Sequence, residues 1–167
     1  MWKKIDPKQL EKNVFSMIGE QWMLVTAGNQ THCNTMTASW GGLGVLWNKP
    51  VATAYIRPQR YTKQFLDENE YFTLSFFGEE YRKQLALCGS KSGSDIDKVA
   101  ESGFTVLEGE GGAPYFDQAE VVLVCRKRFV QQMDPANIPE EICRSVYADK
   151  DYHDIYIGEI TEALIRE

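Results

Sequence analysis

The run at residues 119–131, AEVVLVCRKRFVQ, is the feature that most limits which folds this chain can adopt. It is the longest stretch of β-forming residues, and its first part is apolar at successive positions rather than at alternate ones. Continuous apolar character of this kind is typical of a strand that is buried on both faces. The sequence therefore predicts a sheet with a central strand at this position.

Further runs rich in β-branched and aromatic residues predict strands at 22–27, 34–40, 51–56, 71–77, 103–107 and 154–165. Short helices are expected at 59–68, 79–87 and 96–101, and another begins near Asp6-Pro7. Helices and strands do not alternate regularly, which argues against a doubly wound parallel sheet. We expect one domain over residues 1–167, mainly β, built as a small antiparallel barrel with short peripheral α-helices.

Local signals predict where several of these elements end. Gly28-Asn29 is typical of a hairpin turn, and the glycines at 41, 42 and 44 are expected to break the β pattern. Gly89 is predicted to cap the helix at 79–87 at its C-terminus, and Asp95 to cap the following helix at its N-terminus. Gly158 is expected to bend the last strand.

The charge of the chain excludes two classes of partner. Its formal net charge is −6, whereas nucleic-acid binding and docking on anionic lipid both need a basic face. No window approaches the roughly 18 apolar residues of a transmembrane helix. An acidic protein can still bind a phosphorylated ligand through a local cluster of arginines.

The cysteines and histidines do not predict a metal site. Cys33, Cys88, Cys125 and Cys143 are far apart, and with only two histidines no zinc spacing is present. Buried thiols in a reducing cytoplasm are the simpler interpretation. The N-terminal residues MWKKIDPKQLEKN also lack the apolar core of a signal peptide, so a cytoplasmic location is expected.

A row of hydroxyl side chains makes the predicted strand at 34–40 a candidate binding segment. Thr35, Thr37 and Ser39 alternate along it, and Trp40 follows. Hydroxyls and free backbone N–H groups suit a phosphate or the polar edge of a ring. Threonine is also a good strand former, so an ordinary strand explains the same pattern.

The sequence RPQRYT, from Arg57 to Thr62, is a second candidate. Arginine presents a planar fork of donors that matches a phosphate, and the helix start behind Pro58 offers unpaired N–H groups. A surface turn with solvated arginines is the alternative.

Two weaker candidates follow. The polar loop at 89–95 places Lys91 among glycines and serines but lacks the order of a phosphate-binding P-loop, and a mobile linker explains it equally well. His153 stands beside Asp154, where a solvated or structural histidine is the more common case. No hydrolytic triad and no dinucleotide-binding glycine fingerprint are present.

Five segments in order resemble a known family: NTMTASWGG, KPVATAYIRPQRYT, CGSKSGSDIDK, PYF with AEVVLVCRK, and DYHDIYIGEI. They are similar to the flavin reductase family of FMN-binding split β-barrels, over about residues 22–160. The resemblance implies a Greek-key split barrel, a homodimer, and FMN near the subunit interface. It also implies NADH or NADPH as a transient hydride donor.

Position by position, the resemblance assigns residues to the flavin. Met36, Thr37, Ala38, Ser39 and Trp40 would meet the ring, while Arg57, Pro58, Arg60, Tyr61 and Thr62 would hold the phosphate and ribityl groups. Cys88, Gly89, Ser90, Lys91 and Ser92 would complete the phosphate side, and His153 would contact flavin or nicotinamide. Family members more often read Ser-Gly-Arg-Asp where this chain has Ser94, so no preference for NADPH is expected.

The resemblance leaves three functions open. The first is an NAD(P)H-dependent flavin oxidoreductase, whose acceptor could be free flavin, a metal, a quinone or a redox protein. The second is a flavoredoxin-like FMN electron carrier without nicotinamide-dependent activity. The third is a split barrel that no longer binds flavin, which the presence of Ser39, Arg57 and Arg60 disfavours.

Overall fold

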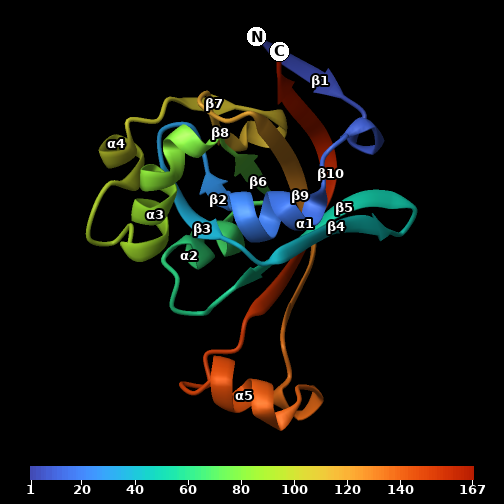
Figure 1. Ribbon diagram of the computed structural model, residues 1–167, viewed down its shortest axis with the longest axis vertical. Helices are drawn as coiled ribbons and strands as arrows, with labels where there is room; N and C mark the ends of the chain where they lie inside the picture. Colours follow the sequence, from blue (N-terminus) through green and yellow to red (C-terminus); the bar gives the residue numbers. More distant parts are fainter.

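One antiparallel sheet dominates the computed structural model, which describes residues 1–167 (Figure 1). Its strands are β1 (Trp2–Ile5), β2 (Met23–Gly28), β3 (Cys33–Ala38), β4 (Gly41–Leu46), β5 (Lys49–Ile56), β6 (Tyr71–Phe76), β9 (Val121–Gln132) and β10 (Asp154–Arg166). The order across the sheet is β3-β2-β6-β9-β10-β5-β4, and β1 pairs with β10. A separate hairpin contains β7 (Val106–Glu108) and β8 (Pro114–Phe116).

The two ends of this sheet are adjacent in the chain. β3 and β4 are its edge strands, yet only Ser39 and Trp40 separate them. Two residues cannot span a flat sheet of this width, so the sheet must curl until its edges approach each other. The result is a barrel that remains split between β3 and β4, which confirms the mainly β fold predicted from the sequence.

β9 is the central strand that its apolar run predicted. It lies between β6 and β10, and residues 121–125 are fully buried. Tyr156, Phe72 and Phe76 are the largest buried side chains inside the barrel. Gly158 lies at a register shift between β9 and β10, as expected for a bend in the last strand.

The helices are short: α1 (Val14–Ser16), α2 (Thr62–Glu68), α3 (Arg82–Ser90) and α4 (Lys98–Ser102), which lie on the outside of the barrel, and α5 (Glu140–Val146). α2 packs against β2 and β3, and α3 and α4 pack near β3. α5 lies apart from the barrel, at the far end of the ribbon formed by β9 and β10 (Figure 1, orange). None of the helices has the length and apolar character needed to span a bilayer.

The prediction that the glycines after Trp40 end the β pattern was wrong. Gly41–Leu46 is strand β4, which pairs with β5 along its whole length. Only Gly41 is required by close packing, because an added Cβ at Gly42 or Gly44 would meet nothing within 4 Å. A Cβ added to Gly41 would lie 2.8 Å from the carbonyl oxygen of Thr53 and 2.9 Å from the side chain of Met23. Strand β1, which pairs with β10, was not predicted at all.

Two predicted helix caps were also wrong. Gly89 lies inside α3, which continues to Ser90 and ends at an extended Lys91. Asp97, not Asp95, caps α4, because its side chain accepts the N–H of Ala100 at 3.0 Å. A charged or glycine residue near a helix end therefore identified the end only to within a turn.

Three other predicted elements begin at different residues or are interrupted in the structure, each because of local backbone geometry. The helix predicted at 59–68 begins at Thr62, because the N–H of Arg60 bonds the carbonyl of Arg57 in a turn. Gly103 is not the start of a strand but the left-handed cap of α4, with φ of +69°, so β7 begins only at Val106. The expected N-terminal helix is broken into a 3-10 turn at Pro7–Gln9, then α1, then a π turn at Met17–Gln21.

Candidate functional site

A pocket of about 180 Å³ opens at the split between β3 and β4. Eight of its nine lining residues are candidates identified from the sequence, and Tyr55 of β5 is the ninth: Met36, Thr37, Ala38, Ser39, Trp40, Tyr55, Arg57, Arg60 and His153. They come from β3, the link to β4, the end of β5, the following turn, and the segment before β10. A larger hollow of about 740 Å³ beside α1 holds none of the sequence candidates.

The hydroxyl groups of β3 are not equivalent. Thr35 is fully buried, and its Oγ1 lies 2.8 Å from Oγ1 of Thr26 on β2. Thr37 donates its hydroxyl to the carbonyl of Leu85 in α3. Ser39 has no side-chain partner and lines the pocket, so it is the hydroxyl that remains free to meet a ligand.

His153 is held in the pocket wall by aromatic neighbours. Its Nδ1 lies 2.7 Å from the hydroxyl of Tyr147, and its ring centroid lies 5.4 Å from that of Trp40. The side chain is buried, and burial together with the nearby charge of Arg57 lowers the pKa of His153 below its ordinary value. The imidazole is therefore neutral at pH 7 and above, and can donate a hydrogen bond from one nitrogen while accepting at the other.

Arg57 holds the segment that carries α5. Its Nη1 contacts Oδ2 of Asp151 at 2.6 Å, and its Nη2 donates to the carbonyl of Val146 at 3.2 Å. Its guanidinium also lies over the ring of Tyr147, 5.3 Å from the centroid. Gln59 and Arg57 both donate to Asp151 and lower the pKa of its carboxyl. The resemblance assigned Arg57 to the phosphate, whereas its donors here bond Asp151 and the carbonyl of Val146, and its guanidinium packs on Tyr147, the partner of His153.

Arg60 is engaged differently, because no carboxylate contacts it. It is half-buried at the pocket edge and donates Nη1 to the carbonyl of Gly89 at 3.1 Å. Burial lowers the pKa of its guanidinium. A half-buried arginine with free donors is a suitable partner for a phosphate.

The residues after Arg60 face away from the pocket. The hydroxyl of Thr62 is buried and accepts a hydrogen bond from Nδ2 of Asn34 at 2.8 Å. Tyr61 packs edge-on against Phe65, with ring centroids 5.4 Å apart. Pro58 is exposed in the turn that precedes them. These three residues shape the start of α2 and do not line the pocket itself.

The segment 88–92 reaches the pocket floor from behind β3. Gly89 packs so closely that an added Cβ would lie 3.2 Å from Cβ of Thr37. Cys88 is buried, with its Sγ 3.5 Å from the hydroxyl of Ser102. Lys91 is exposed and Ser90 lies on the outer surface, while Ser92 bonds Ser94 within the loop at 2.7 Å. Burial raises the pKa of the Cys88 thiol, which suits a structural role.

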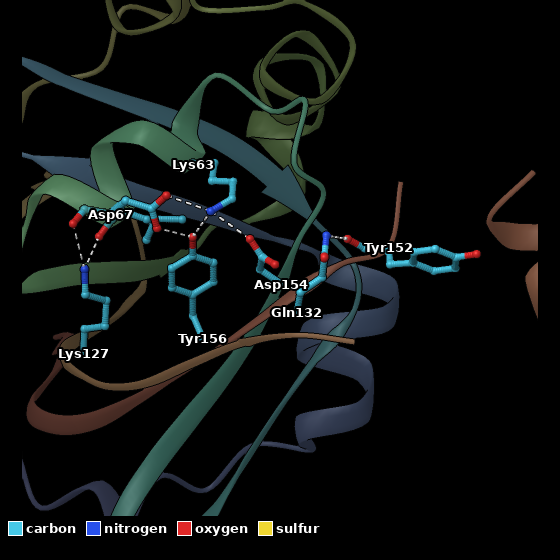
Figure 2. Close-up of polar contacts among 8 residues, drawn as sticks. Lys63, Asp67, Lys127, Gln132, Tyr152, Asp154 and Tyr156 are labelled. Atoms are coloured by element: carbon cyan, nitrogen blue, oxygen red, sulfur yellow. Dashed lines mark hydrogen bonds and ion pairs between the residues drawn. The ribbon is translucent and has the colours of Figure 1, made fainter. Parts of the chain in front are cut away.

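A polar network joins α2 to the start of β10, next to His153 (Figure 2). The ammonium of Lys63 lies 2.7 Å from carboxylate oxygens of both Asp67 and Asp154. The hydroxyl of Tyr156, whose side chain is fully buried, bonds Asp67 and receives a hydrogen bond from Lys63 at 3.0 Å. Because Asp154 follows His153, this network fixes the start of the strand that positions the histidine.

Sequence reasoning missed three residues of this region. Tyr55 and Tyr147 are aromatic residues in segments with many others, and nothing in their spacing indicated that they meet His153. Lys98 is buried beneath β3, where its Nζ donates to two backbone carbonyls. The string DIDK around Lys98 was one of the segments that resembled the family, which is the only signal that could have identified it.

Residues 15–167 match the family described as flavin reductase like domain. The chain belongs to this family. A search of curated proteins found no match. Among solved structures, the flavoredoxin of Methanosarcina acetivorans is 24% identical with a TM-score of 0.71, and the alignment covers 98% of this chain and 77% of that one.

Two further solved structures share the fold of this flavin reductase-like protein. An FMN-binding domain of a flavin reductases-like enzyme from Shewanella baltica is 18% identical, with a TM-score of 0.70 over 99% of this chain and 77% of that one. An NADH:FAD oxidoreductase of Streptomyces globisporus, in complex with NAD and FAD fragments, is 19% identical, with a TM-score of 0.64 over 87% and 79%. These likenesses establish the split-barrel fold.

Proposed function

We propose that the protein binds FMN at the split of the barrel and works as an NAD(P)H-dependent flavin oxidoreductase. The observation that carries this proposal is the convergence of eight sequence candidates, from three separate segments, on one pocket. Family membership supports flavin as the ligand, and the Shewanella baltica relative is described as FMN-binding.

The residues present fit a flavin phosphate and ring. Arg60 has donors that no carboxylate occupies, and the hydroxyl of Ser39 has no partner inside the protein. Trp40 and Tyr55 provide aromatic surface beside them. In this proposal Ser39 and the backbone of β3 meet the polar edge of the ring, Trp40 lies against the ring, and Arg60 holds the phosphate.

A second copy of the chain is part of the proposal. The pocket measures about 180 Å³, whereas sites for ligands of this size are typically ~300–1,000 Å³. Trp40 at its rim is 52% exposed, which is unusual for a tryptophan that serves a binding site alone. A homodimer that covers Trp40 would both bury this ring and enlarge the pocket to the size that FMN needs.

The protein's own side chains have defined tasks in the reaction. The redox chemistry would be supplied by a flavin held in this pocket, with reduced nicotinamide as the hydride donor. Tyr147 is the stronger donor of its pair and donates to Nδ1 of His153, which leaves the N–H at Nε2 available to the pocket. Arg57 and Asp151 hold Tyr147 in place, and Trp40 shields one side of the histidine. These residues orient the reactants and exclude water, and none has to transfer a proton.

Rapid mixing under anaerobic conditions tests the enzyme. The FMN-loaded protein is mixed with NADH and, separately, with NADPH, and flavin absorbance near its visible maximum is followed. Bleaching with either donor supports the reductase. If the protein binds FMN but neither donor bleaches it, the result supports the second candidate function, a flavoredoxin-like electron carrier. The likeness to the Methanosarcina acetivorans flavoredoxin favours this alternative.

A further inference from the structure

Lys98 is a buried cation without an anionic partner. Its side chain lies on α4 beneath β3 and only 4% of the residue is exposed. Nζ donates to the carbonyls of Thr35 at 2.9 Å and of Cys88 at 2.8 Å, and no carboxylate contacts it. Neutral carbonyls compensate a buried ammonium only in part. Burial and the charge of Arg60 accordingly lower the pKa of Lys98 to about 8.

Arg60 approaches the same turn of α3 from the pocket side. Lys98 bonds the carbonyl of Cys88, and Arg60 bonds the carbonyl of the next residue, Gly89, at 3.1 Å. Cations at the last turn of a helix do stabilise its exposed carbonyls. Two like charges that both lack a carboxylate nevertheless repel each other, and the arrangement becomes favourable when an anion with more than one negative charge binds beside them.

The pair of Arg60 and Lys98 lies against the pocket floor. Arg60 lines the pocket directly, and Lys98 holds the carbonyl of Thr35, two residues before Thr37 in the floor. Gly89, between the two cations, packs against Thr37. A phosphate held by Arg60 at this edge would therefore also lie in the field of the buried ammonium.

We propose that Arg60 and Lys98 act together to make this site select the phosphorylated flavin over the unphosphorylated one. Arg60 contacts the phosphomonoester, and Lys98 is a positioning residue that holds the Cys88–Gly89 turn and adds positive charge from below. The phosphomonoester of FMN carries roughly −1.5 to −2 charges at pH 7, whereas riboflavin has the same ring and no phosphate. This proposal rests on the proposed flavin-binding function.

The test compares the dissociation constants of FMN and riboflavin on the same samples. Lys98→Gln keeps hydrogen-bond donors for the two carbonyls but removes the charge, and Lys98→Arg keeps the charge. Lys83→Gln, at an exposed position on the same helix α3 that the cations bond, controls for the change in net charge.

We expect Lys98→Gln to lower the affinity for FMN by about tenfold relative to the affinity for riboflavin, the size of one charge-assisted interaction. Lys98→Arg should retain most of the preference, Arg60→Gln should lose at least as much as Lys98→Gln, and Lys83→Gln should match the wild type. Partial unfolding would affect both ligands equally, so the ratio of the two constants isolates the phosphate.

An equal loss of FMN and riboflavin affinity in Lys98→Gln would assign Lys98 a structural role only and overturn the proposal. So would an unchanged preference for FMN. Neither result would contradict the proposed flavin-binding site. Failure of the wild-type protein to bind both flavins would instead remove the proposed function on which the selection depends.

Discussion

The hydroxyl of Tyr147 lies 2.7 Å from Nδ1 of His153, and both side chains are buried. Burial raises the pKa of Tyr147 and lowers that of His153, so both groups are neutral at pH 7. A neutral phenol donates readily to an imidazole nitrogen. With Tyr147 as the donor, as proposed above, the proton of His153 lies on Nε2. The contact also links the segment that carries α5, residues 133–152, to the pocket at the barrel split.

Removing the hydroxyl of Tyr147 tests whether the segment that carries α5 positions His153. Tyr147→Phe should slow reduction of bound FMN by about fivefold, the equivalent of one hydrogen bond of ~1 kcal/mol. Anaerobic rapid mixing with the better nicotinamide donor measures the rate. Tyr152→Phe is the matched control, because Tyr152 packs against Tyr147 with centroids 5.1 Å apart and its hydroxyl makes no bond to His153. Equal rates in Tyr147→Phe and wild type would show that the contact has no part in the reaction.

Arg60 should account for a large share of the affinity for FMN. Arg60→Ala is expected to weaken binding by about 1.5–3 kcal/mol, as for a hydrogen bond to a charged group. Titration of flavin fluorescence measures the effect. Arg144→Ala is the control, because Arg144 is an exposed arginine on α5 that contacts only Glu140, at 3.8 Å. An Arg60→Ala protein with wild-type affinity would refute the assignment of the phosphate to this residue.

The buried ammonium of Lys98 predicts an unusual dependence of stability on pH. Its pKa is about 8 in the folded protein and ~10.4 in an unfolded chain. Between these values the unfolded state binds more protons, so the free energy of unfolding rises with pH across this window. Below pH 8 both states are protonated, and the cost of burying the charge is present in full.

Chemical denaturation of wild type and Lys98→Met at several pH values measures this linkage. In the absence of flavin, the stability of the wild type relative to Lys98→Met should increase by about 1–3 kcal/mol between pH 7.5 and pH 10. Cysteine and tyrosine titrations cancel in the difference because both proteins share them. A difference that stays constant, or falls, over this range would contradict a lowered pKa for Lys98.

The network around Tyr156 should contribute to the stability of the whole barrel. Its buried hydroxyl contacts the charged groups of Lys63 and Asp67 (Figure 2). Tyr156→Phe is therefore expected to lower the free energy of unfolding by ~1.5–3 kcal/mol. Tyr71→Phe provides the comparison, since Tyr71 is half-buried in β6 and its hydroxyl makes no hydrogen bond within the protein. Equal effects of the two substitutions would indicate that the network adds no stability.

The sequence predicted the central strand and most of the pocket, because both depend on local patterns. The apolar run at 121–125 identifies a strand buried on both faces, and the row of hydroxyls ending at Ser39 and Trp40 identifies a candidate binding segment that lines the pocket. Strand β4 was missed because glycine is a poor strand former, and its pairing with β5 and the close approach of Gly41 to Met23 and Thr53 are set by other strands. Sequence spacing contains no information on such approaches.

The roles of the cations could not be predicted for the same reason. Arg57 and Arg60 are three residues apart and chemically identical, yet Arg57 pairs with Asp151, which lies 94 positions later, and Arg60 has no carboxylate. In the sequence Lys98 looks like an ordinary helix residue. Only the fold shows that its ammonium is buried against the carbonyls of Thr35 and Cys88. A residue's free donors become visible only when its long-range partners are known.

Equilibrium titration of FMN with the purified protein tests the central claim most directly. Binding beside Trp40 and Tyr55 should quench flavin fluorescence in a saturable manner, with one FMN per chain. Ser39, Trp40 and Arg60 line the pocket that this titration probes. Flavin fluorescence that stays unchanged at every protein concentration would contradict the account.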